Sequence, residues 1–143
     1  IASGEELPLD IRGAAIYYAG PTPEKPGQVI GSCGPTTSGR MDAYAPGLLD
    51  CGLAVMIGKG DRNAAVIDAI VRNGAVYLAA MGGAGALMGS CVKAAHIVCY
   101  ADLGCEAIRE LKVENMPLTV VIDSQGNDLY KSGPEAYLRS LED

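Results

Sequence analysis

The run Leu53-Ala-Val-Met-Ile57 is the feature that most restricts the fold of this chain. Its five consecutive apolar residues are typical of a strand that is buried on both faces. After a short glycine-containing turn, Asp61 is a good N-cap for a helix that we expect to reach Asn73, where Gly74 ends it. The segment 75–79 is a second buried strand. A strand, a helix and another buried strand in succession predict an α/β fold.

The rest of the chain also alternates between apolar runs and helical segments, and we expect one domain over residues 1–143. Strands are expected at 13–20, 28–33, 94–100 and 117–123. Helices are expected at about 37–51, with a break or kink at Pro46, at about 81–92, as one turn at 104–110, and at 134–141. A turn at 124–127 and a return over 128–131 predict a hairpin after the last strand.

The segment from Cys33 to Asp42 (Cys-Gly-Pro-Thr-Thr-Ser-Gly-Arg-Met-Asp) has the composition of a loop that holds an anion. Thr36 or Thr37 can cap the helix that we expect after it, and the free N–H groups of a helix start favour negative charge. Arg40 adds a full positive charge and a planar fork that fits a carboxylate. Because Gly, Pro and Thr are also common in turns, a capped helix without a ligand is the alternative.

Glycine stands at three places where a predicted strand leads into a predicted helix, namely Gly34, Gly58 and Gly82. In an α/β sheet such strand ends gather along one edge, where ligands bind. The formal net charge is −6, so an anion site would need local cations. The residues that can supply them are Arg40, Lys59 and Arg62. Close helix packing is the alternative explanation for the run from Met81 to Gly85, which lacks the Gly-x-Gly-x-x-Gly spacing of a dinucleotide site.

The composition excludes several classes of function. With 49% hydrophobic and 20% charged residues the chain is globular, and its acidity argues against a nucleic-acid partner. No window approaches the roughly 18 apolar residues of a membrane span, and no leader pattern opens the chain. Because the first residue is Ile1 rather than Met, we expect a piece of a longer polypeptide.

The cysteine pattern argues against a metal centre that this chain holds alone. The five cysteines (Cys33, Cys51, Cys91, Cys99 and Cys105) include no Cys-x-x-Cys pair. Their odd number and the missing leader point to reduced thiols and a cytoplasmic location. The single histidine, His96, stands in an apolar run without a cysteine or carboxylate neighbour, so we interpret it as structural.

Several motifs follow one another along nearly the whole chain. They are Gly34-Pro-Thr-Thr-Ser-Gly-Arg-Met-Asp42, Gly58-Lys-Gly60, Gly82-Gly83, Tyr100-Ala-Asp-Leu-Gly-Cys-Glu-Ala-Ile108 and the segment 117–127. In this order they resemble the beta subunit, or C-terminal domain, of class I iron-sulfur fumarases and L-tartrate dehydratases. The resemblance implies a three-layer swivelling β/β/α domain with a mixed sheet, and a hydro-lyase that interconverts fumarate and (S)-malate. It also implies a four-iron, four-sulfur cluster whose open iron acts as Lewis acid on the departing hydroxyl, and which the alpha subunit or N-terminal domain holds.

The resemblance also assigns roles within the loop. By similarity, Arg40 and Lys59 bind the substrate carboxylates, Gly34 and Thr37 belong to the same substrate-binding loop, and Thr36 takes the position of the family's proposed general base. A threonine hydroxyl is not basic near neutral pH. Thr36 could therefore accept the C3 proton only as an alkoxide that nearby cations and a helix N-terminus stabilise.

The family usually carries an Arg-Asp-Ala-Ala-His motif shortly before the first strand, and this chain starts after that point. We therefore expect the piece to be inactive alone and to dock on a cluster-bearing partner, as a hetero-oligomer or dimer, through an apolar patch around the glycine-rich edge. An L-tartrate dehydratase or methyl-fumarate hydratase would use the same loop, and would differ by a hydroxyl or methyl worth about 1–3 kcal/mol. A non-catalytic module that binds anions or regulates is the alternative from another class.

Overall fold

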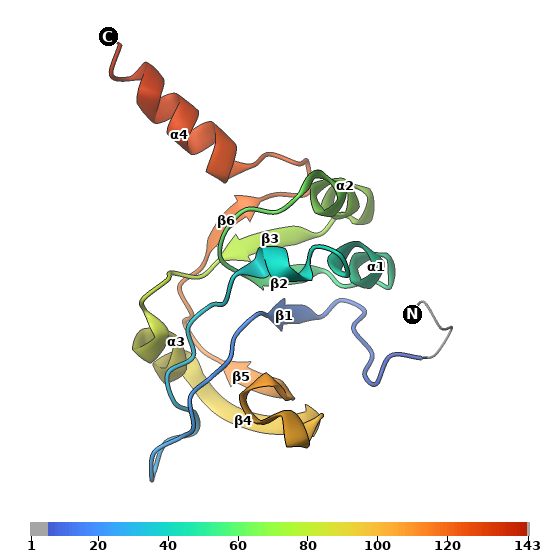
Figure 1. The fold of residues 1–143 in the computed structure, drawn as a ribbon, viewed down its shortest axis with the longest axis vertical. Helices are drawn as coiled ribbons and strands as arrows, with labels where there is room; N and C mark the ends of the chain where they lie inside the picture. Colours follow the sequence, from blue (N-terminus) through green and yellow to red (C-terminus); the bar gives the residue numbers. More distant parts are fainter. Residues whose placement is uncertain (1–5, 143) are drawn as a thin grey trace.

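A four-stranded mixed sheet forms the middle of the computed structural model, which describes residues 6–142 (Figure 1). In spatial order its strands are β1 (Ala15–Tyr17), β2 (Val55–Gly58), β3 (Val76–Ala79) and β6 (Thr119–Ile122). The first three are parallel, and β6 pairs antiparallel with β3. Parallel neighbours need long crossover connections, which the helices between them supply. The predicted α/β class with a mixed sheet is confirmed.

Helices cover one face of this sheet (Figure 1). They are α1 (Ala45–Asp50) and α2 (Ala64–Asn73), and the short 3-10 helix η1 (Ser38–Met41) precedes them. Met56 of β2 and Tyr77 of β3 point to this face, because alternate residues of a strand face opposite sides. They pack with Leu49 of α1 and Ile70 of α2 in the main core, where all four are fully buried.

A second, two-stranded sheet lies against the other face. It is the antiparallel pair β4 (Val92–Cys99) and β5 (Ile108–Val113), preceded by α3 (Gly85–Cys91). Tyr17 of β1 packs against Val92, and Ile57 of β2 packs against Met88 of α3. Helices, central sheet and second sheet therefore make the three layers that the resemblance implies.

Two further helices complete the described chain. The 3-10 helix η2 (Ala101–Glu106) connects β4 to β5, and α4 (Leu129–Arg139) extends away from the layers (Figure 1). No residue of α4 is buried. Within residues 6–142, every helix is too short or too polar to cross a bilayer.

Several predicted elements differ from the structure. The expected strand at 28–33 is a loop that bonds to itself, since Thr22 N–H donates to Ser32 O and Gly31 N–H to Thr22 O. The expected helix at 37–51 is divided into η1 and α1, and Pro46 lies in the first turn of α1 rather than inside a continuous helix. Proline suits that position because its missing N–H would have no partner there.

Thr37 occupies the N-cap position of η1, as predicted, although its side chain makes no hydrogen bond there. Two other helix starts and one hairpin were predicted wrongly. Asn63 rather than Asp61 caps α2 by accepting from Val66 N–H. The helix expected from about 81 begins at Gly85. Asp128 does not return as a strand, although it makes one bridge to Ile122; its carboxylate caps α4. The turn expected at 104–110 lies earlier, at 101–106, and β5 follows it.

Candidate functional site

The three glycine junctions lie together where the parallel strands end. Cys33 N–H donates to Gly85 O at 2.9 Å, and a Cβ built on Gly34 would lie 3.3 Å from Gly85 Cα. A Cβ built on Gly82 would lie 3.9 Å from Lys59 Nζ. The prediction that the three glycines gather at one edge of the sheet is confirmed, although Gly34 follows a loop rather than the expected strand.

The loop from Cys33 to Thr37 is fixed to the end of β1. The Tyr17 hydroxyl donates to Cys33 O at 2.8 Å, and Thr36 N–H donates to Tyr18 O at 2.8 Å. Cys33 is only 1% exposed, and burial raises the pKa of its thiol. Cys33 is therefore a neutral packing residue beneath the loop rather than a nucleophile.

Thr36 is exposed, and its hydroxyl has a defined partner. Thr36 Oγ1 donates to the same Tyr18 carbonyl oxygen at 3.2 Å. A carbonyl oxygen can only accept, so this bond stabilises the neutral hydroxyl and disfavours an alkoxide. Thr36 can act as a proton acceptor only after this bond has been broken.

Lys59 follows β2 and is joined through its backbone to the loop. Ser38 N–H donates to Lys59 O at 3.0 Å, Lys59 N–H donates to Ser38 Oγ at 3.1 Å, and Thr37 forms a parallel bridge with Lys59. Ser38 is fully buried. These bonds hold the backbones of the Arg40 and Lys59 segments next to each other.

Arg40 and Lys59 are the charges that remain available at this edge. Arg40 is exposed in η1 and Lys59 is partly buried. No carboxylate among residues 6–142 lies within ion-pair distance of either side chain. Other basic residues, such as Arg72 with Asp50, have a carboxylate partner. In an acidic chain, two cations without partners beside one loop suit an anionic ligand.

Arg62, the third predicted cation, does not contribute to an anion site. Its side chain is fully buried, and its Nε donates to Asp42 Oδ1 at 2.6 Å. The expectation that Arg62 supplies charge to the ligand is therefore wrong. Its neighbours Ser38 and Asp42 were not singled out from the sequence, although both belong to the motif that contains Arg40.

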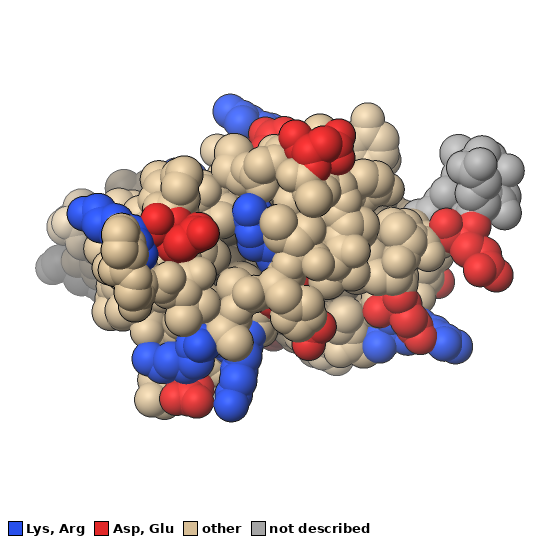
Figure 2. Space-filling model, turned by 90° about the horizontal axis from the view of Figure 1, so that it is seen from below, with Lys and Arg blue, Asp and Glu red and all other residues tan. Residues whose placement is uncertain are grey.

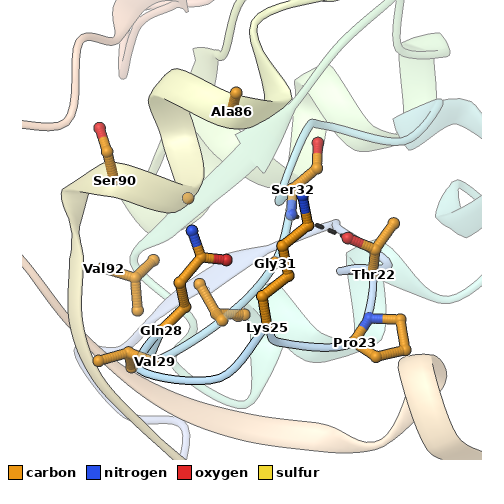
Figure 3. Close-up of a pocket in the computed structure, with 12 residues that line it drawn as sticks. Thr22, Pro23, Lys25, Gln28, Val29, Gly31, Ser32, Ala86, Ser90 and Val92 are labelled. Atoms are coloured by element: carbon orange, nitrogen blue, oxygen red, sulfur yellow. Dashed lines mark hydrogen bonds between the residues drawn. The ribbon is translucent and has the colours of Figure 1, made fainter.

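A separate cavity of about 490 Å³ lies between the loop at 22–32 and α3 (Figure 3). Thr22, Ser32 and Ser90 contribute hydroxyls to its lining, and Lys25 is the one charged residue there. The Ser32 N–H donates to Thr22 Oγ1 at 2.9 Å and holds the loop closed. The lining contains neither Thr36 nor either of the two available cations, so the cavity is not the predicted site.

The described residues show no metal-binding group of their own. No three His, Cys, Asp or Glu side chains among residues 6–142 converge. Cys33 and Cys91 are buried, Cys51 and Cys105 are exposed, and all five cysteines are free thiols. The residues that the structure describes therefore do not fit an iron-sulfur cluster.

His96 lies on β4, where the sequence predicts a strand, but it is exposed. Its Nε2 lies 2.9 Å from Glu110 Oε2 on the paired strand β5. The expectation that no carboxylate neighbours it is wrong, because β5 was not predicted. Both side chains are more than half exposed, as for a surface pair rather than a catalytic one.

Two surface features indicate what kind of macromolecule the protein could bind: the apolar side chains near the glycine-rich edge and the distribution of charge. Large apolar side chains are exposed in the segments next to the edge, at Tyr44, Met81 and Leu87. On the face drawn in Figure 2, basic groups lie beside acidic ones and do not form a continuous basic surface. The first observation suits a protein partner, and the second offers no surface for nucleic acid on that face.

Comparisons with known proteins identify relatives over nearly the whole chain. The family model of the Fumarase C-terminus matches residues 1–133. The chain is 40% identical over 131 residues to the aerobic class I fumarate hydratase of Escherichia coli (strain K12), which covers 90% of this chain and 24% of that protein. It is 38% identical over 130 residues to fumarate hydratase 2 of Leishmania major, with 90% and 23% covered.

A shorter relative is covered more completely. A Methanocaldococcus jannaschii protein, provisionally named L(+)-tartrate dehydratase subunit beta, is 39% identical over 137 residues, which cover 92% of this chain and 70% of that protein. By contrast, the chain spans about a quarter of the length of the fumarate hydratases that it matches.

Proposed function

Because this chain belongs to the Fumarase C-terminus family, we propose that it forms the substrate-gripping part of a hydro-lyase that hydrates fumarate reversibly to (S)-malate. The relatives named as fumarate hydratases and as a tartrate dehydratase subunit support the reaction class. The chain corresponds to about a quarter of those hydratases, so the activity would belong to the completed protein.

The observation that carries this proposal is the pair of available cations, Arg40 and Lys59. A dicarboxylate presents two negative groups, and each needs a charged partner when water is excluded. The backbone bonds between Ser38 and Lys59 hold the two cation-bearing segments together. We assign one substrate carboxylate to each cation, with the planar guanidinium of Arg40 suited to bidentate binding.

The loop that contains Gly34 and Thr37 would complete the substrate-binding site. Gly34 allows the loop to approach Gly85 closely, because a side chain there would press on the backbone of α3. Thr37 lies beside Lys59 through their backbone bridge and is exposed, so we assign its hydroxyl a polar contact with the bound carboxylates. Both residues would shape the site rather than react.

Thr36 remains our candidate for the group that accepts the C3 proton. Its hydroxyl would have to leave the Tyr18 carbonyl as the substrate enters, and Arg40 and Lys59 would then stabilise the alkoxide. This step costs more than it would for a carboxylate base, since threonine is a very weak acid. The assignment therefore needs a direct test.

The rest of the site would come from another domain or subunit. The iron-sulfur cluster that the resemblance implies would belong to that partner, because the residues described here do not fit it. Tyr44, Met81 and Leu87 offer an apolar contact beside the edge. We also place the protein in a reducing compartment such as the cytoplasm, where its free cysteines stay thiols.

L-Tartrate dehydration is the second candidate function. It is favoured by the relative with a tartrate dehydratase name, of which this chain covers 70%. The two substrates differ by one hydroxyl, and the same cations would bind either. A methyl-fumarate hydratase is a related alternative that no comparison supports specifically.

The deciding experiment combines the full-length protein with its cluster-bearing partner without oxygen. Absorbance of the unsaturated diacid is followed with malate and then with L-tartrate as substrate. Turnover of malate that Arg40→Ala abolishes would support the fumarase proposal, and turnover of tartrate alone would support the second candidate. If the complex forms with its cluster intact and neither substrate reacts, the non-catalytic module is the better interpretation.

A further inference from the structure

Arg62 is a fully buried charge three residues beyond Lys59. Its Nε donates to Asp42 Oδ1 at 2.6 Å, and Asp42 Oδ2 accepts from Asn63 N–H at 2.7 Å. Both oxygens of one carboxylate thus bind the segment that follows β2. Asp42 lies two residues after Arg40, and Arg62 lies three residues after Lys59. The Asp42–Arg62 ion pair therefore joins the Arg40 segment to the Lys59 segment.

Two tyrosine rings enclose the guanidinium. Arg62 Cζ lies 5.0 Å from the ring centroid of Tyr77 and 5.6 Å from that of Tyr18. Such distances give a favourable interaction between the cation and each ring, stronger where water is excluded. The guanidinium is therefore held on its faces as well as at its edge.

The Tyr77 ring extends this arrangement to Lys59. Its hydroxyl lies 2.9 Å from Ser38 Oγ and 3.0 Å from Gly60 O. Burial raises the pKa of Tyr77 to about 12, so its single proton stays in place at neutral pH. Since Tyr77 can donate only one proton, Ser38 donates to Tyr77 when Tyr77 donates to Gly60. Ser38 Oγ in turn accepts from Lys59 N–H.

The Tyr18 ring extends it to Thr36. The backbone oxygen of Tyr18 accepts both the amide and the hydroxyl of Thr36. Arg62 thus contacts, through one intermediate residue each, the backbones of the segments that carry Arg40, Lys59 and Thr36.

This cluster is built poorly for stability alone. Among residues 6–142, Arg62 Nη2 and Tyr18 Oη are buried without a hydrogen-bond partner, and Arg62 Nη1 has only the Met56 sulfur at 3.3 Å. A buried ion pair with unsatisfied neighbours is often no more stable than apolar side chains of the same volume. What the cluster does provide is a fixed orientation of the Arg62 guanidinium, because each contact restricts one side of this planar group.

We propose that Arg62, acting through Asp42 and the two tyrosines, is a positioning residue that sets the spacing of the Arg40 and Lys59 cations. It touches no substrate. The inference rests on the proposed function only for its kinetic consequence; the mechanical consequence, that Arg62 orders the Ser38 and Lys59 backbones, does not need it.

The kinetic test uses Arg62→Lys in the full-length protein with its partner. Lysine keeps the charge near Asp42 and loses the planar fork. We expect KM for the dicarboxylate to rise about tenfold with a smaller change in kcat, because carboxylate binding is what depends on the spacing. The matched control is Ile70→Ala, which removes a fully buried core side chain of α2 without touching the site. At a similar loss of melting temperature this control should keep the KM of the wild type.

Amide hydrogen exchange in the same complex provides a readout that does not depend on turnover. The Ser38 and Lys59 amides, which donate to Lys59 O and Ser38 Oγ, should exchange faster in Arg62→Lys than in Ile70→Ala. Equal exchange in the two variants, or an unchanged KM with a lowered melting temperature, would overturn the proposal. If Arg62→Lys does not fold, Tyr77→Phe removes one hydroxyl of the same network and is expected to accelerate exchange at Lys59; unchanged exchange there would overturn the proposal too.

The two proposals fail in different ways. Absence of turnover in the wild-type complex would refute the proposed function and leave the exchange result to decide the role of Arg62. Normal wild-type turnover with no difference between the variant and its control would refute only the positioning role.

Discussion

Ser38 Oγ occupies the position in which a Cβ on Gly58 would lie. The hydroxyl oxygen is the atom nearest to a side chain built there, and a Tyr18 ring carbon follows at 3.2 Å. The last residue of β2 can be only glycine while Ser38 keeps its bonds to Lys59 and Tyr77. The absence of a side chain at Gly58 therefore has a steric explanation, in addition to the turn that begins at this residue.

Gly58→Ala is expected to destabilise the chain by about 1–3 kcal/mol, because Ser38 is fully buried and cannot move aside freely. Thermal unfolding should show a melting temperature several degrees lower. Gly20→Ala is the matched control, since no atom of residues 6–142 lies within 4 Å of a Cβ built on Gly20. Equal melting temperatures for the two variants would contradict the packing described here.

Arg40→Ala in the completed enzyme is expected to reduce kcat/KM by at least about 30-fold, which corresponds to about 2 kcal/mol for the loss of a charged partner. Arg139→Ala is the control, because Arg139 is an exposed arginine of α4, away from the glycine-rich edge. Steady-state kinetics without oxygen would measure both. Similar kinetics for Arg40→Ala and the wild type would remove Arg40 from the site.

Thr36→Val and Thr36→Ser separate the two roles of the Thr36 hydroxyl. Valine keeps the shape and loses the oxygen, whereas serine keeps the oxygen. If Thr36 accepts the proton, Thr36→Val should lower kcat by about 10²-fold or more, and Thr36→Ser should retain most of it. A loss of only a few-fold in Thr36→Val would make Thr36 a residue that positions the loop through Tyr18.

The Asp50–Arg72 pair predicts a pH dependence of stability. Hydrogen bonds from Arg72 and then Asn73 lower the pKa of the Asp50 carboxyl from 3.8 to about 2. A lowered folded-state pKa adds stability above the unfolded value, and this contribution is lost as the pH falls through the folded value. The wild type should therefore be more stable than Asp50→Asn above about pH 4, and the difference should vanish near pH 2.

Because Asp50 and Arg72 are both about half exposed, this difference is expected to be small and to shrink in high salt. Urea unfolding of both proteins between pH 2 and 6 would measure it. Asp102→Asn, which changes an exposed carboxylate of η2 that has no ion-pair partner among residues 6–142, should show no such trend. A difference that grows towards low pH would contradict the assignment.

The sequence predicted the part of the fold that local pattern determines. The run at 53–57, the helix after it and the strand at 75–79 form one parallel unit with short connections, so hydrophobic pattern and glycine position sufficed. The positions of Gly58 and Gly82 at the ends of β2 and β3 followed from this unit, whereas Gly34 follows a loop that was predicted to be a strand. In this region the sequence alone led to the correct edge of the sheet.

Features that depend on distant contacts were not predictable in the same way. β5 was not predicted, and its pairing with β4 is what makes it a strand. Residues 28–33 look like a strand, but Gly31 and Ser32 bond to Thr22 instead. Asp128 is equally suited to a turn and to a helix cap, and packing decides between them. Arg62 was predicted as a cation of the anion site because an acidic chain needs local positive charge there. Its burial, which is rare for a charged residue, is explained only by Asp42 and the two tyrosine rings.

The order of the strands also has a consequence for how the site comes into being. Residues 18–54 separate β1 from its neighbour β2, and the whole Thr36–Arg40 loop lies within that interval. Its anchors, Tyr18 on one side and Lys59 on the other, come together only when these two strands pair. Contacts of such sequence separation cost loop-closure entropy before they add stability, so the loop should acquire its shape in the same cooperative step as the sheet. A partly folded chain would then carry the complete motif and still be unable to hold a dicarboxylate.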